Sequence, residues 1–322
     1  MYSWFLIFCL CVTAAANVFA NEGQYIEHRG VTGNINWSTG KVNADGYGVA
    51  PDNKPAKVGS LLACRAAVVD AQRNLLEVIQ GVRVNSTTLV SKYILASDEM
   101  RSTVDGIVKN AALLSREPDD NGSCKVTMSA PLDGAASKAV YAQVLAQQKQ
   151  GLSRLPRPDW NFSLFSRAYA SEATEAETAS WQDTLNQLSQ RIAALEQRLT
   201  NTPQLTQADN KPTGLVVDAR GSNFIPSMDP KIRQLRGGIV YPNVEVTRQH
   251  MHEGRLVSLF ARDMDFALSH PIVGARPLVV KSLRTWGDTR TEIVLVSEYA
   301  DRIIELDKSG FFADAGVIII LD

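Results

Sequence analysis

The sequence predicts an α+β protein: two α+β domains joined by linkers and a short coiled-coil helix, after an N-terminal signal peptide. The first observation is a long amphipathic helix, Lys57–Gln80, flanked by segments with the alternation typical of strands. The second is a return of strand and helix signals over Gly214–Asp322. The third is the irregular stretch 151–180 between them, which contains Pro156, Pro158 and a polar run at 171–178 with too little apolar content for a core.

The first 20 residues predict a signal peptide, because an apolar run at 4–12 is followed by small residues and by Val18-Phe-Ala20 as a cleavage site. We therefore expect export to the periplasm. A short membrane anchor that is kept is the alternative. Cys9 and Cys11 follow bulky residues, which disfavours lipidation. Past Ala20 no apolar run approaches the roughly 18 residues that span a bilayer.

Composition excludes two classes of protein. A chain of 322 residues with 45% hydrophobic and 21% charged residues is ordinary for a globular protein, so disorder throughout is excluded. A formal net charge of -1 leaves no basic excess to neutralise phosphates, so we expect no nucleic-acid partner.

Two cysteines, Cys64 and Cys124, remain after the signal peptide. In an oxidising compartment such a pair favours a disulfide, which would close a loop of roughly 60 residues. Two buried free thiols that pack as small apolar side chains are the alternative. The sequence leaves both open.

The first domain, residues 25–150, contains a predicted hairpin around Thr39-Gly40 before the long helix. We expect Gly81 to cap that helix before a strand at Val82–Val84. The further elements expected are a helical turn at 97–104, a strand at 106–114, a turn at 119–122, a strand at 124–130 and a helix at 134–150.

The long helix is expected to bury its large apolar side chains on a sheet. Projected at 100° per residue, one broad face collects Leu61, Leu62, Val68, Val69, Leu75, Leu76 and Ile79. The opposite face collects Asp70, Arg73, Asn74 and Glu77.

Several sequence blocks in this domain resemble a known family. The blocks are Gly33–Trp37, Val42–Ala50, Arg65–Glu77, Gly81–Val84 and Ser129–Leu132. They are similar to the twenty-kilodalton bacterial surface lipoprotein family, which includes flagellar assembly protein P (FlgP), and the similarity covers roughly Gly30–Leu132. Longer members also lead us to expect a segment like Thr213–Gly221, which is present.

The resemblance implies a non-enzymatic envelope protein whose copies form rings or discs around the flagellar motor. It implies no catalytic residues. This chain lacks the acylated cysteine of the lipoprotein members, so attachment to the outer membrane would come through partner proteins.

A helix predicted at 181–200, before a second linker at 201–213, supports self-association independently. Its apolar residues follow the 4, 3, 4, 3, 4 spacing of a coiled coil. They are Trp181, Leu185, Leu188, Ile192, Leu195 and Leu199. An amphipathic helix folded back on one domain is the alternative.

The last region, 214–322, predicts a second α+β domain. Strands are expected at 215–219, 239–244, 277–284, 292–297 and 316–321, and helices at 258–268 and 299–306.

Candidate chemistry is sparse. His250 and His252 would lie on one side of an extended strand, with Asp263 and Asp265 following, which makes a divalent metal conceivable. No Cys or third His lies close in sequence, so a surface or structural role is favoured. We expect no cofactor, no bound metal and no small-molecule substrate.

The sequence thus favours an oligomeric structural protein of the bacterial envelope, with itself and flagellar motor or outer-membrane ring proteins as partners. A periplasmic adaptor or binding module of another envelope assembly is the alternative. An envelope enzyme with a metal near His250 is a third hypothesis.

Overall fold

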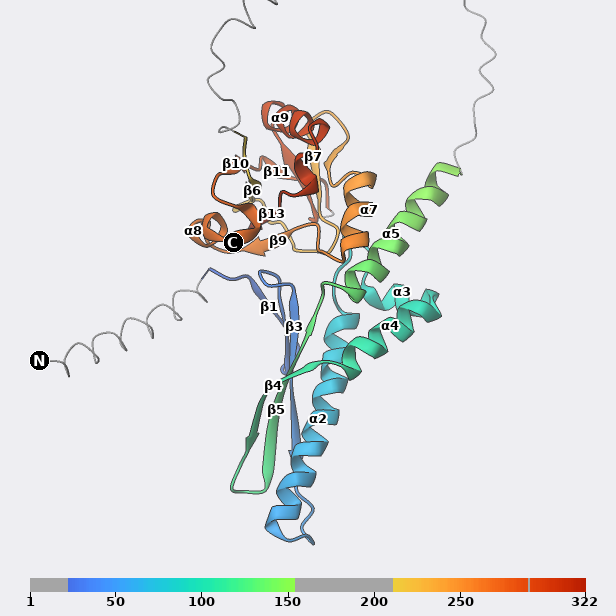
Figure 1. The fold of residues 1–322 in the computed structure, drawn as a ribbon, viewed down its shortest axis with the longest axis vertical. Helices are drawn as coiled ribbons and strands as arrows, with labels where there is room; N and C mark the ends of the chain where they lie inside the picture. Colours follow the sequence, from blue (N-terminus) through green and yellow to red (C-terminus); the bar gives the residue numbers. More distant parts are fainter. Residues whose placement is uncertain (1–22, 154–210, 289) are drawn as a thin grey trace, which may run out of the picture. The chain divides into compact units, whose positions relative to one another are not determined.

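A computed structural model describes residues 23–153, 211–288 and 290–322, without the side chains of 149–153. Helices and strands are mixed in both regions, so the predicted α+β class is confirmed (Figure 1). The predicted signal peptide (1–20) and coiled-coil helix (181–200) lie outside these residues, as do most of the two linkers.

The N-terminal region, residues 23–153, is built on one antiparallel sheet in the order β1-β2-β3-β5-β4. The predicted hairpin around Thr39-Gly40 is confirmed, and Gly40 adopts a φ of 63° at its turn. A second hairpin turns at 119–122, as expected. The strands are β1 (Ile26–Arg29), β2 (Gly33–Asn36), β3 (Lys41–Val49), β4 (Ala112–Pro118) and β5 (Ser123–Pro131).

Helix α2 (Ala56–Gln80) lies along one face of this sheet, against β3 and β5 (Figure 1). Its bounds agree with the prediction to within one residue. Three further helices complete the region: α3 (Val90–Ala96), α4 (Asp98–Lys109) and α5 (Ala135–Ser153).

Two predictions for the N-terminal region are wrong. The strand expected at 106–114 begins only at Ala112, because α4 continues to Lys109. The Ser97 hydroxyl accepts from the Met100 amide and starts that helix, and the buried residues Met100, Val104 and Val108 recur at helical spacing. The segment Val82–Val84 forms no strand, only an isolated bridge between Arg83 and Leu89.

The C-terminal region, residues 211–322, contains two four-stranded sheets. One is parallel, in the order β10-β6-β13-β9, and the other is mixed, in the order β11-β12-β7-β8. The strands are β6 (Gly214–Asp218), β7 (Lys231–Gln234), β8 (Ile239–Tyr241), β9 (Leu259–Ala261), β10 (Pro277–Lys281), β11 (Arg284–Thr285), β12 (Glu292–Leu295) and β13 (Val317–Ile320). The helices are α7 (Val244–Glu253), α8 (Met264–Ser269), η2 (Pro271–Val273), α9 (Ser297–Lys308) and η3 (Phe311–Ala313).

The helix predicted at 258–268 is wrong in its first half, which forms β9, and α8 follows only from Met264. The Asp263 carboxylate caps α8 by accepting from the Phe266 amide. The sequence also missed β7 and α7. The strand predicted at 239–244 ends as β8 at Tyr241, and α7 begins at Val244, because Asn243 accepts from the Val246 amide and acts as its cap.

The N- and C-terminal regions share one hydrophobic core cluster, which includes Trp37, Leu75 and Tyr141 from the first and Phe260 and Tyr241 from the second. Backbone hydrogen bonds cross between them: Phe260 N donates to Trp37 O at 3.2 Å, and Met228 N to Arg83 O at 2.9 Å. The two regions are therefore held by both apolar packing and main-chain pairing.

Candidate assembly surfaces

Helix α2 approaches its sheet unusually closely, because the facing strand positions are glycines. A Cβ built on Gly46 would lie 2.1 Å from the Ala71 amide nitrogen and 2.3 Å from the Ala67 carbonyl oxygen. A Cβ on Gly48 would lie 2.1 Å from the Ala63 carbonyl oxygen. Distances this short exclude any side chain at either glycine, so the helix backbone rests on the strand backbone.

Small residues therefore form the buried face of the first half of α2. Ala63, Cys64, Ala67 and Ala71 are buried, and larger apolar residues reach the core only further along, at Leu75, Val78 and Ile79. The predicted apolar face is wrong in that first half, because Leu61 and Val69 are 65% and 59% exposed.

Polar residues expected on the solvent face instead lie beside the sheet. The Asp70 carboxylate accepts from the Tyr47 amide at 2.9 Å, and the Asn74 side-chain amide donates to Asp45 O at 2.7 Å. These bonds hold α2 to the middle of β3.

A disulfide links α2 to β5. Cys64 and Cys124 are joined, with their Cα atoms 5.0 Å apart and a sequence separation of 60. Closing a loop of this length stabilises the folded state by about 4 kcal/mol in the chain-entropy model. The geometry thus selects the disulfide from the two alternatives that the sequence left open.

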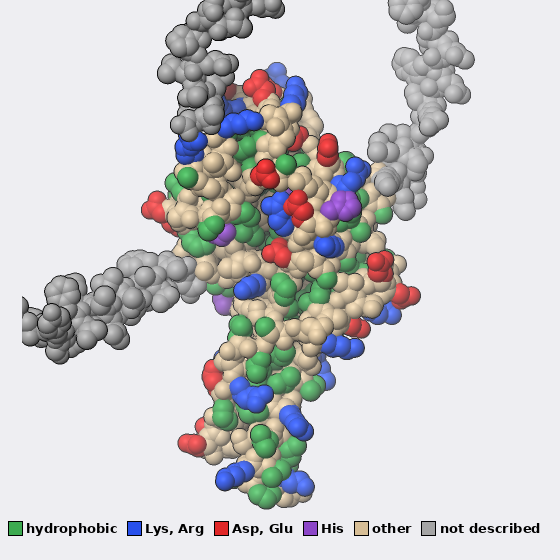
Figure 2. Space-filling view, viewed as in Figure 1, with side chains coloured by type: hydrophobic (Ala, Val, Ile, Leu, Met, Phe, Trp, Pro, Cys, Tyr) green, Lys and Arg blue, Asp and Glu red, His purple; other side chains and the backbone are tan. Residues whose placement is uncertain are grey.

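The outer side of α2 carries a row of six exposed residues spaced four apart, which we call the α2 stripe: Lys57, Leu61, Arg65, Val69, Arg73 and Glu77. Leu61 and Val69 are two positions from the buried Ala63 and Ala71, which is about 200° around a helix. Leu61 and Val69 therefore point away from the buried face of α2, and at the start of the stripe Lys57 and Leu61 line a pocket beside the β4–β5 turn. Figure 2 shows hydrophobic side chains interspersed with basic ones on the visible surface of this part of the molecule.

The sheet face opposite α2 is bare over its outer half. Alternate residues of β3 face α2 and are buried, so Tyr47 and Val49 point the other way, and they are 55% and 75% exposed. Asp45 lies on the same face, where it accepts from the Thr127 hydroxyl at 2.7 Å and pairs with Lys125 at 3.0 Å. The Asp45 carboxylate raises the pKa of the Lys125 ammonium.

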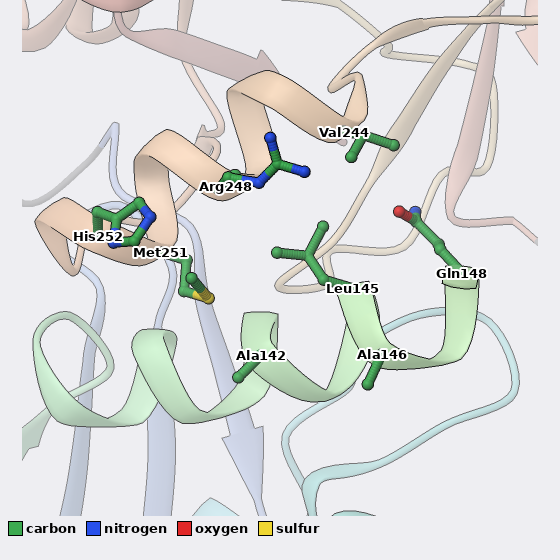
Figure 3. Close-up of a pocket in the computed structure, with 8 residues that line it drawn as sticks. All are labelled: Ala142, Leu145, Ala146, Gln148, Val244, Arg248, Met251 and His252. Carbon is green, nitrogen blue, oxygen red and sulfur yellow. The ribbon is translucent and has the colours of Figure 1, made fainter. Parts of the chain in front are cut away.

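A groove of about 510 Å³ lies between α5 and α7 (Figure 3). Ala142, Leu145 and Ala146 line the α5 side. The Arg248 guanidinium and the His252 imidazole line the α7 side. A smaller adjoining groove continues past α4, lined in part by Glu99 and Lys138. The groove between α5 and α7 has a lining of small apolar residues and a polar rim. Such a groove suits a peptide segment better than a compact polar molecule.

The two histidines considered for a metal do not converge. Both lie on α7, where His250 is buried and His252 lines the groove. The expectation of an extended strand at this point is wrong, because the Asn243 cap starts a helix. In residues 23–153, 211–288 and 290–322, no three His, Cys, Asp or Glu side chains gather to hold a metal.

His250 has no hydrogen-bond partner for either ring nitrogen among the described residues. Burial, reinforced by the nearby Arg255 guanidinium, lowers its pKa to about 4. The imidazole is therefore neutral at physiological pH, and it packs as part of the core.

A buried polar cluster lies where the N- and C-terminal regions meet. The Tyr141 hydroxyl donates to Met228 O at 2.8 Å and accepts from the Val257 amide at 3.0 Å. Burial raises the pKa of Tyr141 well above its ordinary value. Nearby, Lys231 pairs with Asp229 at 2.6 Å, and burial raises the pKa of that carboxyl despite the ammonium. The cluster satisfies polar atoms of the interface and offers no open site.

None of the helices in the described part of the chain is long and apolar enough to cross a membrane. The six predicted coiled-coil residues, Trp181 to Leu199, lie outside the described residues. The exposed α2 stripe and the bare sheet face were missed by the sequence reasoning. The signal that could have found them is the pair of glycines in Gly46-Tyr-Gly48 together with the spacing of Ala63, Ala67 and Ala71.

Residues 214–322 match the model of a family described as the second domain of Treponema pallidum Tp0624. This chain is similar to that domain over its C-terminal region. No curated protein matches the chain.

Proposed function

We propose that this chain is a non-enzymatic structural protein of the bacterial envelope. Its copies assemble into a ring or disc associated with the flagellar motor, and the assembly is needed for motility. The observation that carries this proposal is the α2 stripe, which exposes Leu61 and Val69 on a rigid layer.

The energetic argument rests on where those side chains lie. Burial of apolar surface contributes roughly 25 cal/mol per Å², so large apolar groups held on an outer face favour association. Close packing on Gly46 and Gly48 and the Cys64–Cys124 disulfide keep this face ordered before association. A preorganised surface loses less conformational entropy on binding.

The placement in the envelope rests on two supports. A disulfide in the N-terminal region fits an oxidising compartment such as the periplasm. The sequence blocks between Gly30 and Leu132 resemble the lipoprotein family that contains FlgP. Flagellar motor or outer-membrane ring proteins are accordingly the proposed partners, and no cofactor is invoked.

Sedimentation of the secreted chain over a range of concentrations tests self-assembly. We expect oligomers for the natural chain and a shift toward monomer for Leu61→Glu/Val69→Glu. The control is Leu95→Glu in α3, which changes a leucine that is even more exposed, at 80%, outside the stripe. A chain that is monomeric at every concentration would overturn the proposal.

Deletion of the gene tests the motor association. We expect loss of motility and a missing ring in electron micrographs of isolated basal bodies. Normal swimming together with intact basal bodies would contradict this part of the proposal.

The second candidate is a periplasmic adaptor or binding module of another envelope assembly. The groove between α5 and α7 favours it, because Ala142 and Ala146 leave room for a partner segment beside Arg248. Crosslinking in cells distinguishes the two. A bulky Ala142→Trp change should abolish a crosslinked partner if the groove binds one, and should leave self-assembly through the α2 stripe intact.

A further inference from the structure

The N-terminal region has two unlike outer surfaces on opposite sides of a two-layer unit. On one side is the α2 stripe, and on the other is the sheet face around Tyr47 and Val49. Both carry exposed large apolar side chains, and in the described residues no element covers either.

The two surfaces differ in charge. The stripe has three basic residues, Lys57, Arg65 and Arg73, and one acidic residue, Glu77. None of these four has an ion-pair partner within the part of the chain that the structure describes.

The sheet face around Tyr47 has the opposite balance. On its outer half Asp45 pairs with Lys125 at 3.0 Å, which leaves Glu117, opposite Lys125 in the strand register, as the unpaired charge among the described residues there, while Lys41 lies on the same face at the other end of β3. Arg116 lies opposite the buried Val126, so its side chain belongs to the other face of the sheet. The basic stripe and the unpaired Glu117 attract each other, whereas two basic stripes would repel.

The two surfaces also match in length. From Leu61 to Val69 a helix rises about 12 Å, and over the bare outer half of β3, from Asp45 to Val49, a strand rises about 13 Å. The middle of the stripe can therefore lie along the bare part of β3.

We infer that the α2 stripe of one copy packs on the bare sheet face of the next copy. Leu61 and Val69 then contact Tyr47 and Val49, and the stripe's arginines approach Glu117. Because the contact joins two different surfaces, each added copy leaves one stripe and one sheet face free, so the assembly closes into a ring or grows into a filament. This inference rests on the proposed self-assembly and specifies its interface.

A charge-swap experiment with the full chain tests it. One variant carries Arg65→Glu/Arg73→Glu, and the other carries Glu117→Arg. Alone, each places like charges on both surfaces, so we expect sedimentation to report at least tenfold weaker association. Mixed, the acidic stripe meets the altered sheet and the basic stripe meets the unaltered sheet. We expect the mixture to recover the association of the natural chain.

Crosslinking gives a second, independent readout. Chains with Val69→Cys and differently tagged chains with Tyr47→Cys, both also carrying Cys9→Ser/Cys11→Ser, are mixed and treated with a short bismaleimide. The native disulfide has no free thiol to react. We expect mixed-tag products joining positions 47 and 69, and few products from Val69→Cys alone. Leu95→Cys is the exposed control, and it should form no crosslinked product with either the Val69→Cys chain or the Tyr47→Cys chain.

The outcomes separate this inference from the function on which it rests. Oligomers that crosslink mainly through 69 to 69, or that do not recover when the charge variants are mixed, would overturn the helix-to-sheet contact and leave self-assembly standing. A natural chain that sediments as a monomer would overturn both.

Discussion

Gly46 of β3 lies directly beneath Ala71 of α2, so close that a Cβ on the glycine would fall 2.1 Å from the alanine's amide nitrogen. This contact sets the distance between the helix and the sheet. It also determines which side of the helix is left outside, and hence where the α2 stripe lies.

Replacing Gly46 with alanine should destabilise the fold, because backbone atoms on the far side cannot move out of the way as a flexible side chain would. We expect Gly46→Ala to lower the free energy of unfolding by about 1–3 kcal/mol or more, measured by urea denaturation. Gly106→Ala is the matched control, since nothing lies within 4 Å of a Cβ at that helical position. It should stabilise by about 0.5–1 kcal/mol. Equal effects of the two changes would contradict the close-packing account.

Loss of the disulfide should weaken the contact between α2 and β5. We expect Cys64→Ala/Cys124→Ala to lower the free energy of unfolding by about 2–5 kcal/mol. Adding a thiol reductant should lower the urea midpoint of the natural chain and leave that of the double variant unchanged. If reduction did not move the natural midpoint, the bond would not contribute in this way.

Tyr141 should contribute to the coupling of the N- and C-terminal regions. Tyr141→Phe removes a hydroxyl that bonds both Met228 O and Val257 N, and leaves these two buried groups without a partner. We expect a loss of about 1–3 kcal/mol in calorimetric or urea unfolding. Tyr93→Phe is the control, because its hydroxyl makes one longer bond, 3.4 Å to Gln147. A loss as large in the control would show that the effect is general to tyrosine hydroxyls.

His250 should make stability depend on pH. A histidine whose pKa is lower in the folded state adds stability that is fully present above the ordinary value of 6.5 and is lost as the pH falls toward about 4. The loss attributable to this group is up to about 3 kcal/mol. We expect His250→Leu to show a smaller drop in unfolding free energy between neutral and mildly acid pH than the natural chain. His252→Leu, on the same helix, should keep the natural dependence.

Local patterns predicted the elements whose signals are short-range. The bounds of α2 agree to within one residue, because a 25-residue helix repeats its period many times. The hairpin at Thr39-Gly40 was also predicted, since its turn glycine is a local requirement. Elements of three to four residues such as β7 and β9 were missed or merged, because they carry too few residues to display a period.

The candidate surfaces could not be predicted in the same way. In a helical projection weighted by hydrophobicity, Leu61 and Val69 count for more than Ala63 and Ala71. The projection therefore predicts that Leu61 and Val69 face the sheet, whereas the two alanines do. Gly46 and Gly48, which lie about 15 to 25 residues earlier in the chain than the alanines they contact, reverse that ranking, because they admit only small residues at the contact.

By itself, the sequence determined the α+β class, the length of α2 and the pairing of the hairpins, because these follow from periodicity and turn chemistry within short windows. Only the tertiary structure decided that Cys64 meets Cys124, that His250 is buried on a helix, and that Leu61 and Val69 face outward. Each of these depends on the distance between segments far apart in the chain, which backbone packing sets and no local pattern encodes.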